Sequence, residues 1–171
     1  MANFKEISCN EISENTFKLI GKDWMLVTAG DKNSYNTMTA SWGGLGFLWN
    51  KNVTFTFIRP QRYTLDFMNN NDYYTLSFFD EDMRDALKFC GTKSGRDYDK
   101  AKETGLLPVF DSDAPYFEQA KLVLVCKKLF VQDFTSDSFI DKDIDKSVYA
   151  LGDYHKMFIS EIEKVFVREN D

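Results

Sequence analysis

Residues 36–49, with the sequence NTMTASWGGLGFLW, hold the residue types best suited to binding a ligand. The segment begins at Asn36. The hydroxyl groups of Thr39 and Ser41, with the backbone amides of residues 40–44, supply many hydrogen-bond donors and acceptors. Three glycines follow, and glycine lets a flat molecule approach the backbone closely. Because small residues occur where a core would contain bulky ones, the segment predicts a hollow that holds a bound aromatic cofactor.

The run FCGTKSGRD is a first candidate for binding an anion such as a phosphate. It joins the end of one expected helix to the start of the next, and it brings Lys93, Ser94 and Arg96 near free backbone amides. An ordinary loop between two helices has the same composition, so both interpretations stay open.

A second candidate for an anion site follows an expected strand. Arg59, Gln61 and Arg62 occur within four residues there. The planar fork of a guanidinium group suits phosphate oxygens, but solvated surface arginines are equally common.

Three aromatic residues could contact a ligand. Trp42 and Trp49 flank the glycines and could stack on a planar ring, or they could serve in core or interface packing. His155 is the only histidine. It is a candidate for a substrate contact, and the competing interpretation is a structural hydrogen bond.

The remaining composition excludes most protein-borne chemistry. A single histidine rules out a His-rich metal site, and we expect no bound metal. Cys9, Cys90 and Cys126 are widely separated, so they form neither a disulfide framework nor a CxxC motif. The glycines at 44 and 46 lack the third glycine of a dinucleotide fingerprint, because Trp49 occupies that position. Any redox or transfer chemistry would therefore belong to a cofactor.

Length and charge describe the kind of protein. The 171 residues, 43% of them hydrophobic, are expected to form one domain over residues 1–171. Aromatic residues make up 16% of the chain and favour strands, so we expect a mainly β protein. The net charge of −6 argues against binding nucleic acid. We find no apolar stretch that could span a membrane and no signal peptide, so we expect a cytoplasmic protein.

Hydrophobic periodicity and turn residues predict the elements that position these candidates. The predicted strands are residues 16–20, 24–29, 37–41, 53–58, 73–79, 122–134, 154–158 and 159–167. The second and third strands of this series should pair, and the third leads into the glycine segment.

Three helices are predicted. One begins near Thr64. A second is capped by Asp80 and should end at Gly91, and a third, over residues 97–104, should end at Gly105. Residues 133–147 are expected to form a surface loop with a short helical turn.

Together these motifs resemble the flavin reductase-like family of FMN-binding split barrels, which includes flavoredoxins. The resemblance rests on NTMTASWGG, IRPQRYT, LSFFD, CGTKSGRDYDK and the Tyr154-His155 pair, in that order along residues 24–161. Family membership implies a six-stranded antiparallel Greek-key split β-barrel with flanking helices. It also implies a homodimer with flavin near the subunit interface.

The resemblance also assigns roles to residues. It places Thr39, Ala40, Ser41 and Trp42 against the ring and ribityl chain of FMN, within the motif that begins at Asn36. The phosphate would be held either by Arg59, Gln61 and Arg62 or by Lys93 and Ser94.

The expected function is an FMN-dependent oxidoreductase that passes electrons from NADH or NADPH through flavin to an acceptor. One alternative is a flavoredoxin-like electron carrier that is reduced by a protein partner. Another is a non-redox barrel that binds a different planar ligand or a protein partner.

Overall fold

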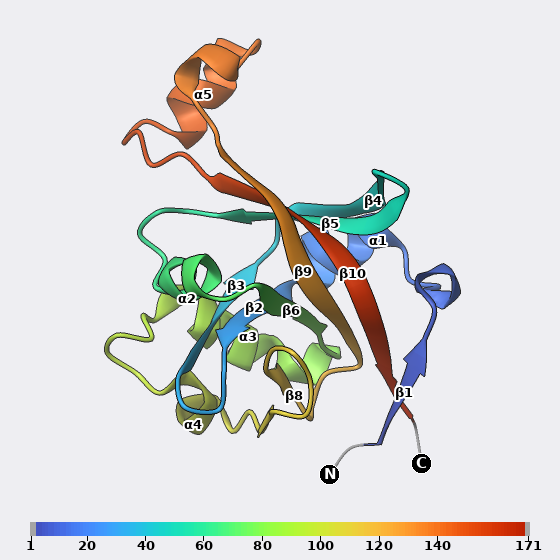
Figure 1. Cartoon of the computed structure of the whole chain (residues 1–171). Helices are drawn as coiled ribbons and strands as arrows, with labels where there is room; N and C mark the ends of the chain where they lie inside the picture. Colours follow the sequence, from blue (N-terminus) through green and yellow to red (C-terminus); the bar gives the residue numbers. More distant parts are fainter. Residues whose placement is uncertain (1–2, 170–171) are drawn as a thin grey trace.

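The computed structural model describes residues 3–169, and its main feature is one antiparallel sheet of eight strands (Figure 1). The strands follow the order β3-β2-β6-β9-β10-β5-β4, and β1 pairs with β10. Their bounds are β1 Phe4–Ile7, β2 Met25–Gly30, β3 Tyr35–Ala40, β4 Gly43–Leu48, β5 Lys51–Ile58, β6 Tyr73–Phe78, β9 Leu122–Asp133 and β10 Lys156–Arg168. Two short strands, β7 Pro108–Val109 and β8 Tyr116–Phe117, form a separate pair.

Short helices surround this sheet. They are η1 Cys9–Glu11, α1 Thr16–Lys18, the π-helix η2 Leu19–Asp23, α2 Thr64–Asn70, η3 Glu81–Met83, α3 Arg84–Thr92, α4 Lys100–Thr104, η4 Ser136–Ser138 and α5 Lys142–Val148. In Figure 1, α2, α3 and α4 lie beside β2 and β3, and α5 projects from the body beyond the ends of β9 and β10. The predicted mainly β barrel with flanking helices is confirmed.

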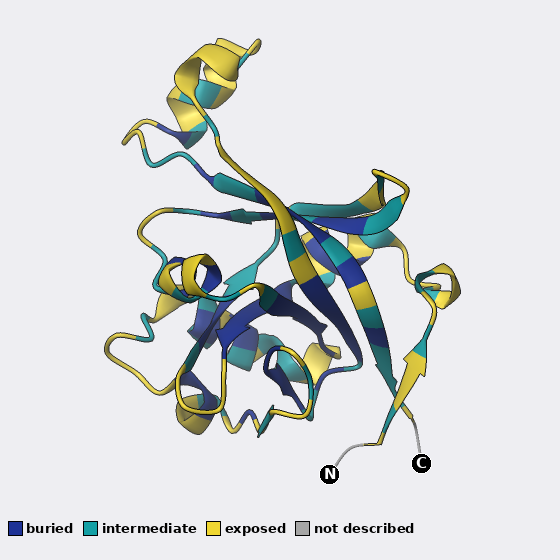
Figure 2. Cartoon of the chain, in the orientation of Figure 1, coloured by how far each residue is buried: buried dark blue, intermediate teal, exposed yellow. Residues whose placement is uncertain are grey.

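The six strands expected for the barrel correspond to β2, β3, β5, β6, β9 and β10, and β1 and β4 are additional. β2 is buried along its whole length because both its faces are covered. Met25, Val27 and Ala29 pack into one hydrophobic cluster, and Leu26 packs into a second one. This two-sided burial explains why the strand is continuously apolar. Figure 2 shows the same concentration of buried residues on β2 and β6.

Three predicted strands differ from the structure. Residues 16–20 form helical turns because the side chain of Asn15 caps them, accepting a 3.0 Å hydrogen bond from the backbone amide of Lys18. Residues 154–158 and 159–167 are not separate strands, since the single strand β10 runs from Lys156 to Arg168 and leaves out residues 154 and 155. The pairing with β9 shifts register between Ile159 and Ser160, and this bulge interrupts the alternation of the sequence.

The predicted helices are present, with corrections at their ends. Asp80 precedes η3 but makes no side-chain capping hydrogen bond, and α4 begins at Lys100 rather than at residue 97. Gly105 ends α4 with a φ of +72°, as expected for a glycine at this position. Gly91 does not end the preceding helix, because α3 continues to Thr92. A Cβ atom at Gly91 would lie 3.2 Å from that of Thr39, so this glycine lets α3 approach β3 closely.

The two ends of the sheet meet at the segment of interest. β3 and β4 are the terminal strands of the sheet order, yet only Ser41 and Trp42 separate them in the chain. The barrel is therefore open between β3 and β4, at this corner. The predicted domain over residues 1–171 extends into residues 1–2 and 170–171, which lie outside the described residues.

Candidate functional site

A hollow of about 200 Å³ lies at the corner between β3 and β4. It brings together seven of the residues singled out from the sequence: Thr39, Ala40, Ser41, Trp42, Arg59, Arg62 and His155. Met38 and Phe57 complete its lining. The indole of Trp42 is 51% exposed and lies 5.1 Å from the ring of His155. We call this space the ring hollow, since its lining combines aromatic surface with hydroxyl and amide groups.

The glycines themselves do not form the hollow, which corrects the prediction. A Cβ atom at Gly44 or Gly46 would contact the ring of Phe55, at 3.6 and 3.2 Å. Phe55 belongs to β5, which pairs with β4. The space beside the glycines is thus filled by a neighbouring strand. Trp49 also lies outside the ring hollow, and its ring packs 6.1 Å from Phe130.

A second hollow, of about 140 Å³, adjoins the first and shares Met38 and Arg62 with it. Asn36, Gln61, Lys93, Ser94 and Lys100 also line this space, which we call the anion hollow. Its wall depends on a glycine, because a Cβ atom at Gly95 would lie 1.9 Å from the side-chain oxygen of Asn36. Asn36 is in turn held by a 2.8 Å hydrogen bond that it donates to Thr64.

Arg62 is a half-buried cation with a buried, unused donor. Its Nη1 donates to the carbonyl oxygen of Gly91 at 2.9 Å, and its buried Nη2 has no hydrogen-bond partner among the described residues. Burial lowers the pKa of the guanidinium group. Since a buried donor without an acceptor is destabilising, the arrangement fits an anionic ligand.

Lys100 is a second cation at the anion hollow, this one fully buried, and no pattern in the sequence singled it out. The residue is 6% exposed, and its ammonium group donates to the carbonyl oxygens of Thr37, at 2.7 Å, and Cys90, at 2.9 Å. Burial lowers its pKa to about 8. Lys100 belongs to a short, lysine-rich helical segment that appears solvent-exposed in the sequence. The only signal was its position in the CGTKSGRDYDK motif.

Arg59 and Gln61 are engaged elsewhere. Arg59 pairs with the carboxylate of Asp153 and donates to the carbonyl of Val148 at 3.0 Å, and Gln61 donates to Asp153 at 2.9 Å. Hydrogen bonds from Gln61 and then Arg59 lower the pKa of Asp153. These two residues therefore anchor the segment that follows α5. Arg59 lies at the ring hollow and Gln61 at the anion hollow, but both already bind a carboxylate.

Lys93 and Ser94 lie at the rim of the anion hollow. Lys93 is exposed, with its ammonium group 5.5 Å from the ring centre of Tyr98. The hydroxyl of Ser94 accepts a 3.2 Å hydrogen bond from the backbone amide of Arg96, which shapes the loop.

His155 is buried beside Trp42 and is neutral at pH 7. Its Nδ1 lies 2.7 Å from the hydroxyl of Tyr149. Burial, and secondarily the charge of Arg59, lower its pKa to about 4. His155 lines the ring hollow, where a ligand could contact it. It also makes a structural hydrogen bond, to Tyr149, which was the alternative expected from the sequence.

The fold and these two hollows define a class of protein: a split β-barrel whose open corner fits a ligand with a planar part and an anionic end. The sequence profile of the family described as "Flavin reductase like domain" matches residues 17–171. The chain belongs to this family, as its motifs indicated.

Solved structures show the same fold. The FMN-binding domain of a flavin reductases-like enzyme from Shewanella baltica OS155 is 15% identical with a TM-score of 0.70, over 98% of this chain and 78% of that chain. A flavoredoxin from Methanosarcina acetivorans is 18% identical with a TM-score of 0.69, over 96% and 76%. An NADH:FAD oxidoreductase from Streptomyces globisporus C-1027 is 14% identical with a TM-score of 0.64, over 86% and 75%.

A comparison with curated protein sequences finds no match. Within residues 3–169, no helix combines the length and apolar character needed to cross a membrane.

Proposed function

We propose that this protein binds FMN and passes electrons from NADH or NADPH through the flavin to an acceptor. The observation that carries the proposal is the buried Nη2 of Arg62, which has no partner among the described residues. Arg62 lines both hollows, so a ligand that fills both would place its anionic end beside this donor. FMN combines a planar ring, a polyhydroxylated chain and a phosphate in that order.

The residues present fit this cofactor. Arg62 and Lys100 would hold the phosphate, with Lys93 and Ser94 at the rim. Thr39, Ala40, Ser41 and Trp42 would hold the ring and the chain with hydroxyl, amide and aromatic groups. When bound, the flavin supplies hydride and electron transfer, which side chains do not.

The chain contributes positioning and electrostatics to this reaction. Neutral His155 is held by Tyr149 and supports Trp42 without placing a positive charge beside the ring. The half-exposed Trp42 leaves one side of the hollow open to an incoming electron donor. No protein acid or base is required, which agrees with the scarcity of such groups at the corner.

Flavin titration followed by rapid reduction tests the proposal. The purified protein should bind FMN at one site per chain, and NADH or NADPH should bleach the flavin absorbance in a stopped-flow experiment. Slow bleaching by both nicotinamides would favour a flavoredoxin-like carrier, as the flavoredoxin likeness suggests. Failure to bind FMN would contradict the proposal and favour a non-redox barrel.

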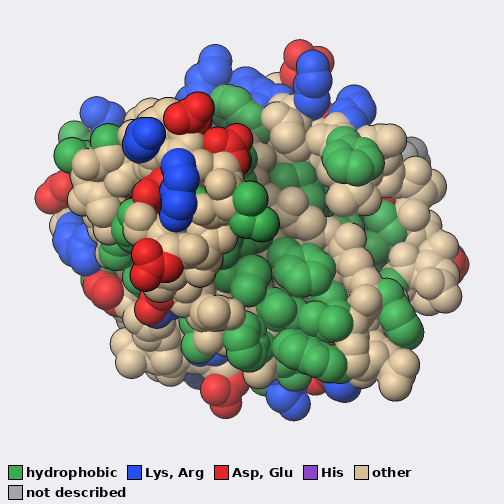
Figure 3. All heavy atoms as spheres, turned by 90° about the horizontal axis from the view of Figure 1, so that it is seen from above, with side chains coloured by type: hydrophobic (Ala, Val, Ile, Leu, Met, Phe, Trp, Pro, Cys, Tyr) green, Lys and Arg blue, Asp and Glu red, His purple; other side chains and the backbone are tan. Residues whose placement is uncertain are grey.

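We also propose that the protein is a homodimer. Figure 3 shows hydrophobic side chains gathered on one face. Exposed large apolar residues occur on β4, in the turn after it and on the outer half of β9: Phe47, Trp49, Leu129, Phe130 and Val131. Trp49 and Phe130 are in contact, which joins the turn after β4 to β9. Beyond Cys126, β9 leaves the core, so three consecutive apolar residues lack cover.

Light scattering during gel filtration tests the dimer. Phe130→Ser should shift the protein towards the monomer, and Leu107→Lys, at an exposed leucine elsewhere, should not. A wild-type monomer at micromolar concentration would contradict the proposed dimer.

Use of a reduced nicotinamide, together with free Cys9, Cys90 and Cys126, supports a cytoplasmic location as part of this proposal.

A further inference from the structure

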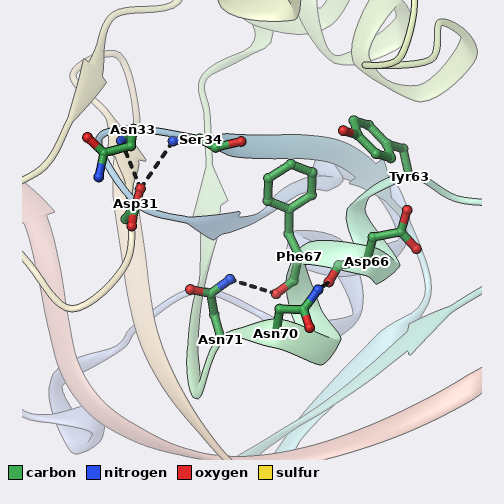
Figure 4. Close-up of a pocket in the computed structure, with 8 residues that line it drawn as sticks. All are labelled: Asp31, Asn33, Ser34, Tyr63, Asp66, Phe67, Asn70 and Asn71. Carbon is green, nitrogen blue, oxygen red and sulfur yellow. Dashed lines mark hydrogen bonds between the residues drawn. The ribbon is translucent and has the colours of Figure 1, made fainter.

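The largest hollow described here, about 520 Å³, lies between the turn that joins β2 to β3 and helix α2 (Figure 4). Its polar side chains hold the surrounding backbone. Asp31 accepts hydrogen bonds from two amides of the turn, and Asn70 and Asn71 donate to carbonyl groups of α2. No buried side-chain atom in its lining lacks a partner within residues 3–169. A polar group that is both fixed and free for a ligand lies instead on His155, at the ring hollow.

The imidazole of His155 is held in one orientation by its neighbours. Its ring packs against those of Trp42, Tyr149 and Phe57, with centroid distances of 5.1, 5.6 and 6.5 Å. The backbone is fixed as well, because the carbonyl oxygen of His155 accepts a 3.0 Å hydrogen bond from the amide of Phe134. The residue is buried, so the ring has little room to turn. Its two nitrogens therefore keep separate surroundings.

These two nitrogens differ in what they contact. Nδ1 lies 2.7 Å from the hydroxyl oxygen of Tyr149, whereas Nε2 makes no hydrogen bond within residues 3–169. Nε2 is not one of the buried atoms that lack a partner, so it keeps some exposure to solvent. His155 lines the ring hollow and Tyr149 does not. The Nε2 side of the imidazole is thus the part that a ligand can reach.

Tyr149 is itself fixed beside this imidazole. Its backbone amide donates to the carbonyl oxygen of Asp145 at 3.0 Å. Its ring stacks on that of Tyr154, with centroids 5.0 Å apart, and the guanidinium group of Arg59 lies 5.2 Å from its ring centre. The hydroxyl group of Tyr149 is therefore positioned by contacts that do not involve the ring hollow.

The hydrogen bond between the two side chains has one favourable direction. The imidazole is neutral at pH 7, because burial and then the charge of Arg59 lower its pKa to about 4, against an opposing effect of Asp153. Within the described residues, the only hydrogen-bond partner of the Tyr149 hydroxyl is Nδ1 of His155. A buried hydroxyl group is satisfied when its proton is donated, and a neutral imidazole has one bare nitrogen to accept it. The hydroxyl therefore donates to Nδ1, which leaves the ring proton on Nε2.

We infer that Tyr149 is a positioning residue that fixes the tautomer of His155, so that the ring hollow contains a neutral N–H donor at Nε2. Such a donor suits an uncharged acceptor, such as a carbonyl oxygen or a bare ring nitrogen, and it does not suit an amino group. The planar ring of a flavin carries both kinds of acceptor. The choice of ligand rests on the proposed function, whereas the tautomer is a property of the protein alone.

Nitrogen NMR of the apoprotein tests the tautomer. His155 is the only histidine, so histidine labelled with ¹⁵N gives one pair of imidazole signals. The signals are distinguishable, because Nε2 is two bonds from both carbon-bound ring protons and Nδ1 is two bonds from only one. At pH 7 the wild-type protein should show a protonated Nε2 and a bare Nδ1. A proton on Nδ1 in the wild type would overturn the inference.

A pair of tyrosine variants tests the role of Tyr149. Tyr149→Phe should show a measurable population with the proton on Nδ1, because the donor that opposed this tautomer is gone. Tyr154→Phe is the matched control, since its hydroxyl donates to Asp145 at 2.7 Å, and it should keep the wild-type tautomer. An unchanged tautomer in folded Tyr149→Phe would show that another group sets it.

Titration with FMN, followed by the same signals, tests the ligand. Binding should shift the Nε2–H signal. Tyr149→Phe should weaken FMN and riboflavin equally, by about three- to tenfold, because its effect lies at the ring and not at the phosphate. An Nε2–H signal that does not respond to bound FMN would overturn the donor role and leave the proposed function standing. Failure of FMN to bind would contradict the proposed function, while the tautomer of the apoprotein would still be decided by its own spectrum.

Discussion

Arg62 and Lys100 donate to the carbonyl oxygens of two successive residues, Gly91 and Cys90, each at 2.9 Å. Both carbonyls belong to the last turn of α3, where the helix dipole and the unpaired carbonyl groups carry partial negative charge. The two cations are therefore held together by neutral oxygens. An anion can approach them without first displacing a carboxylate.

We expect Lys100→Met to weaken FMN about 10- to 100-fold and to leave riboflavin unchanged, because a charged hydrogen bond contributes about 1.5–3 kcal/mol. Calorimetric titration with both flavins measures the difference. Lys102→Met, at an exposed position of α4, is the control. Equal losses for FMN and riboflavin would show that Lys100 does not act on the phosphate.

The pH dependence of FMN binding should follow the protonation of the Lys100 ammonium group. Its pKa is lowered from 10.5 to about 8, so the ammonium group loses its proton above about pH 8. Phosphate binding favours the protonated form, and FMN affinity should fall by up to tenfold per pH unit above this point. Between about pH 8 and 10.5 the unfolded chain binds the extra proton, so the Lys100 contribution to stability should rise as affinity falls. Lys100→Met should remove both effects, and a pH-independent FMN affinity in the wild type would contradict the assignment.

Substitutions of Arg59 and Arg62, which lie three residues apart, should differ in their effects on flavin binding and stability. Arg62→Met should weaken FMN at least tenfold and spare riboflavin, because it removes the donor shared by the two hollows. Arg59→Met should leave the ratio of FMN to riboflavin affinity unchanged. It should lower the free energy of unfolding by about 1–3 kcal/mol, because Asp153 loses its charged partner and keeps only the hydrogen bond from Gln61. Denaturant titration and flavin titration of each variant give these quantities. The reverse pattern would place the phosphate at Arg59.

Gly95→Ala should impair both the fold and the site. Its Cβ atom would lie 1.9 Å from the oxygen of Asn36, and relieving such overlap costs about 1–3 kcal/mol. FMN affinity should fall because Asn36 lines the anion hollow. Gly21→Ala meets no atom within 4 Å and serves as the control in thermal unfolding. An unchanged melting temperature for Gly95→Ala would contradict this packing.

Ser41→Leu should fill the ring hollow while the barrel remains folded. We expect loss of flavin retention with a near-native circular dichroism spectrum, since Ser41 lies on the short link between β3 and β4. If this variant retained FMN, the flavin ring would have to bind away from the corner between β3 and β4.

Local patterns of residues were enough to predict several helices and strands. The alternation of β5, the apolar run of β2 and the glycine after α4 each report a periodicity or a backbone conformation within a few residues. The ordered motifs of the family, which lie at loops and strand ends, identified the candidate residues and the fold they belong to.

The contacts that these residues make depend on how the chain folds in space. Phe55 fills the space beside the glycines because β4 pairs with β5. Arg59 pairs with Asp153, which lies 94 residues away in the chain. Lys100 has the sequence context of a surface lysine, and it is buried because α4 packs against α3 and β3. Burial and charge pairing depend on contacts between segments that are distant in the sequence. Local residue patterns do not specify those contacts.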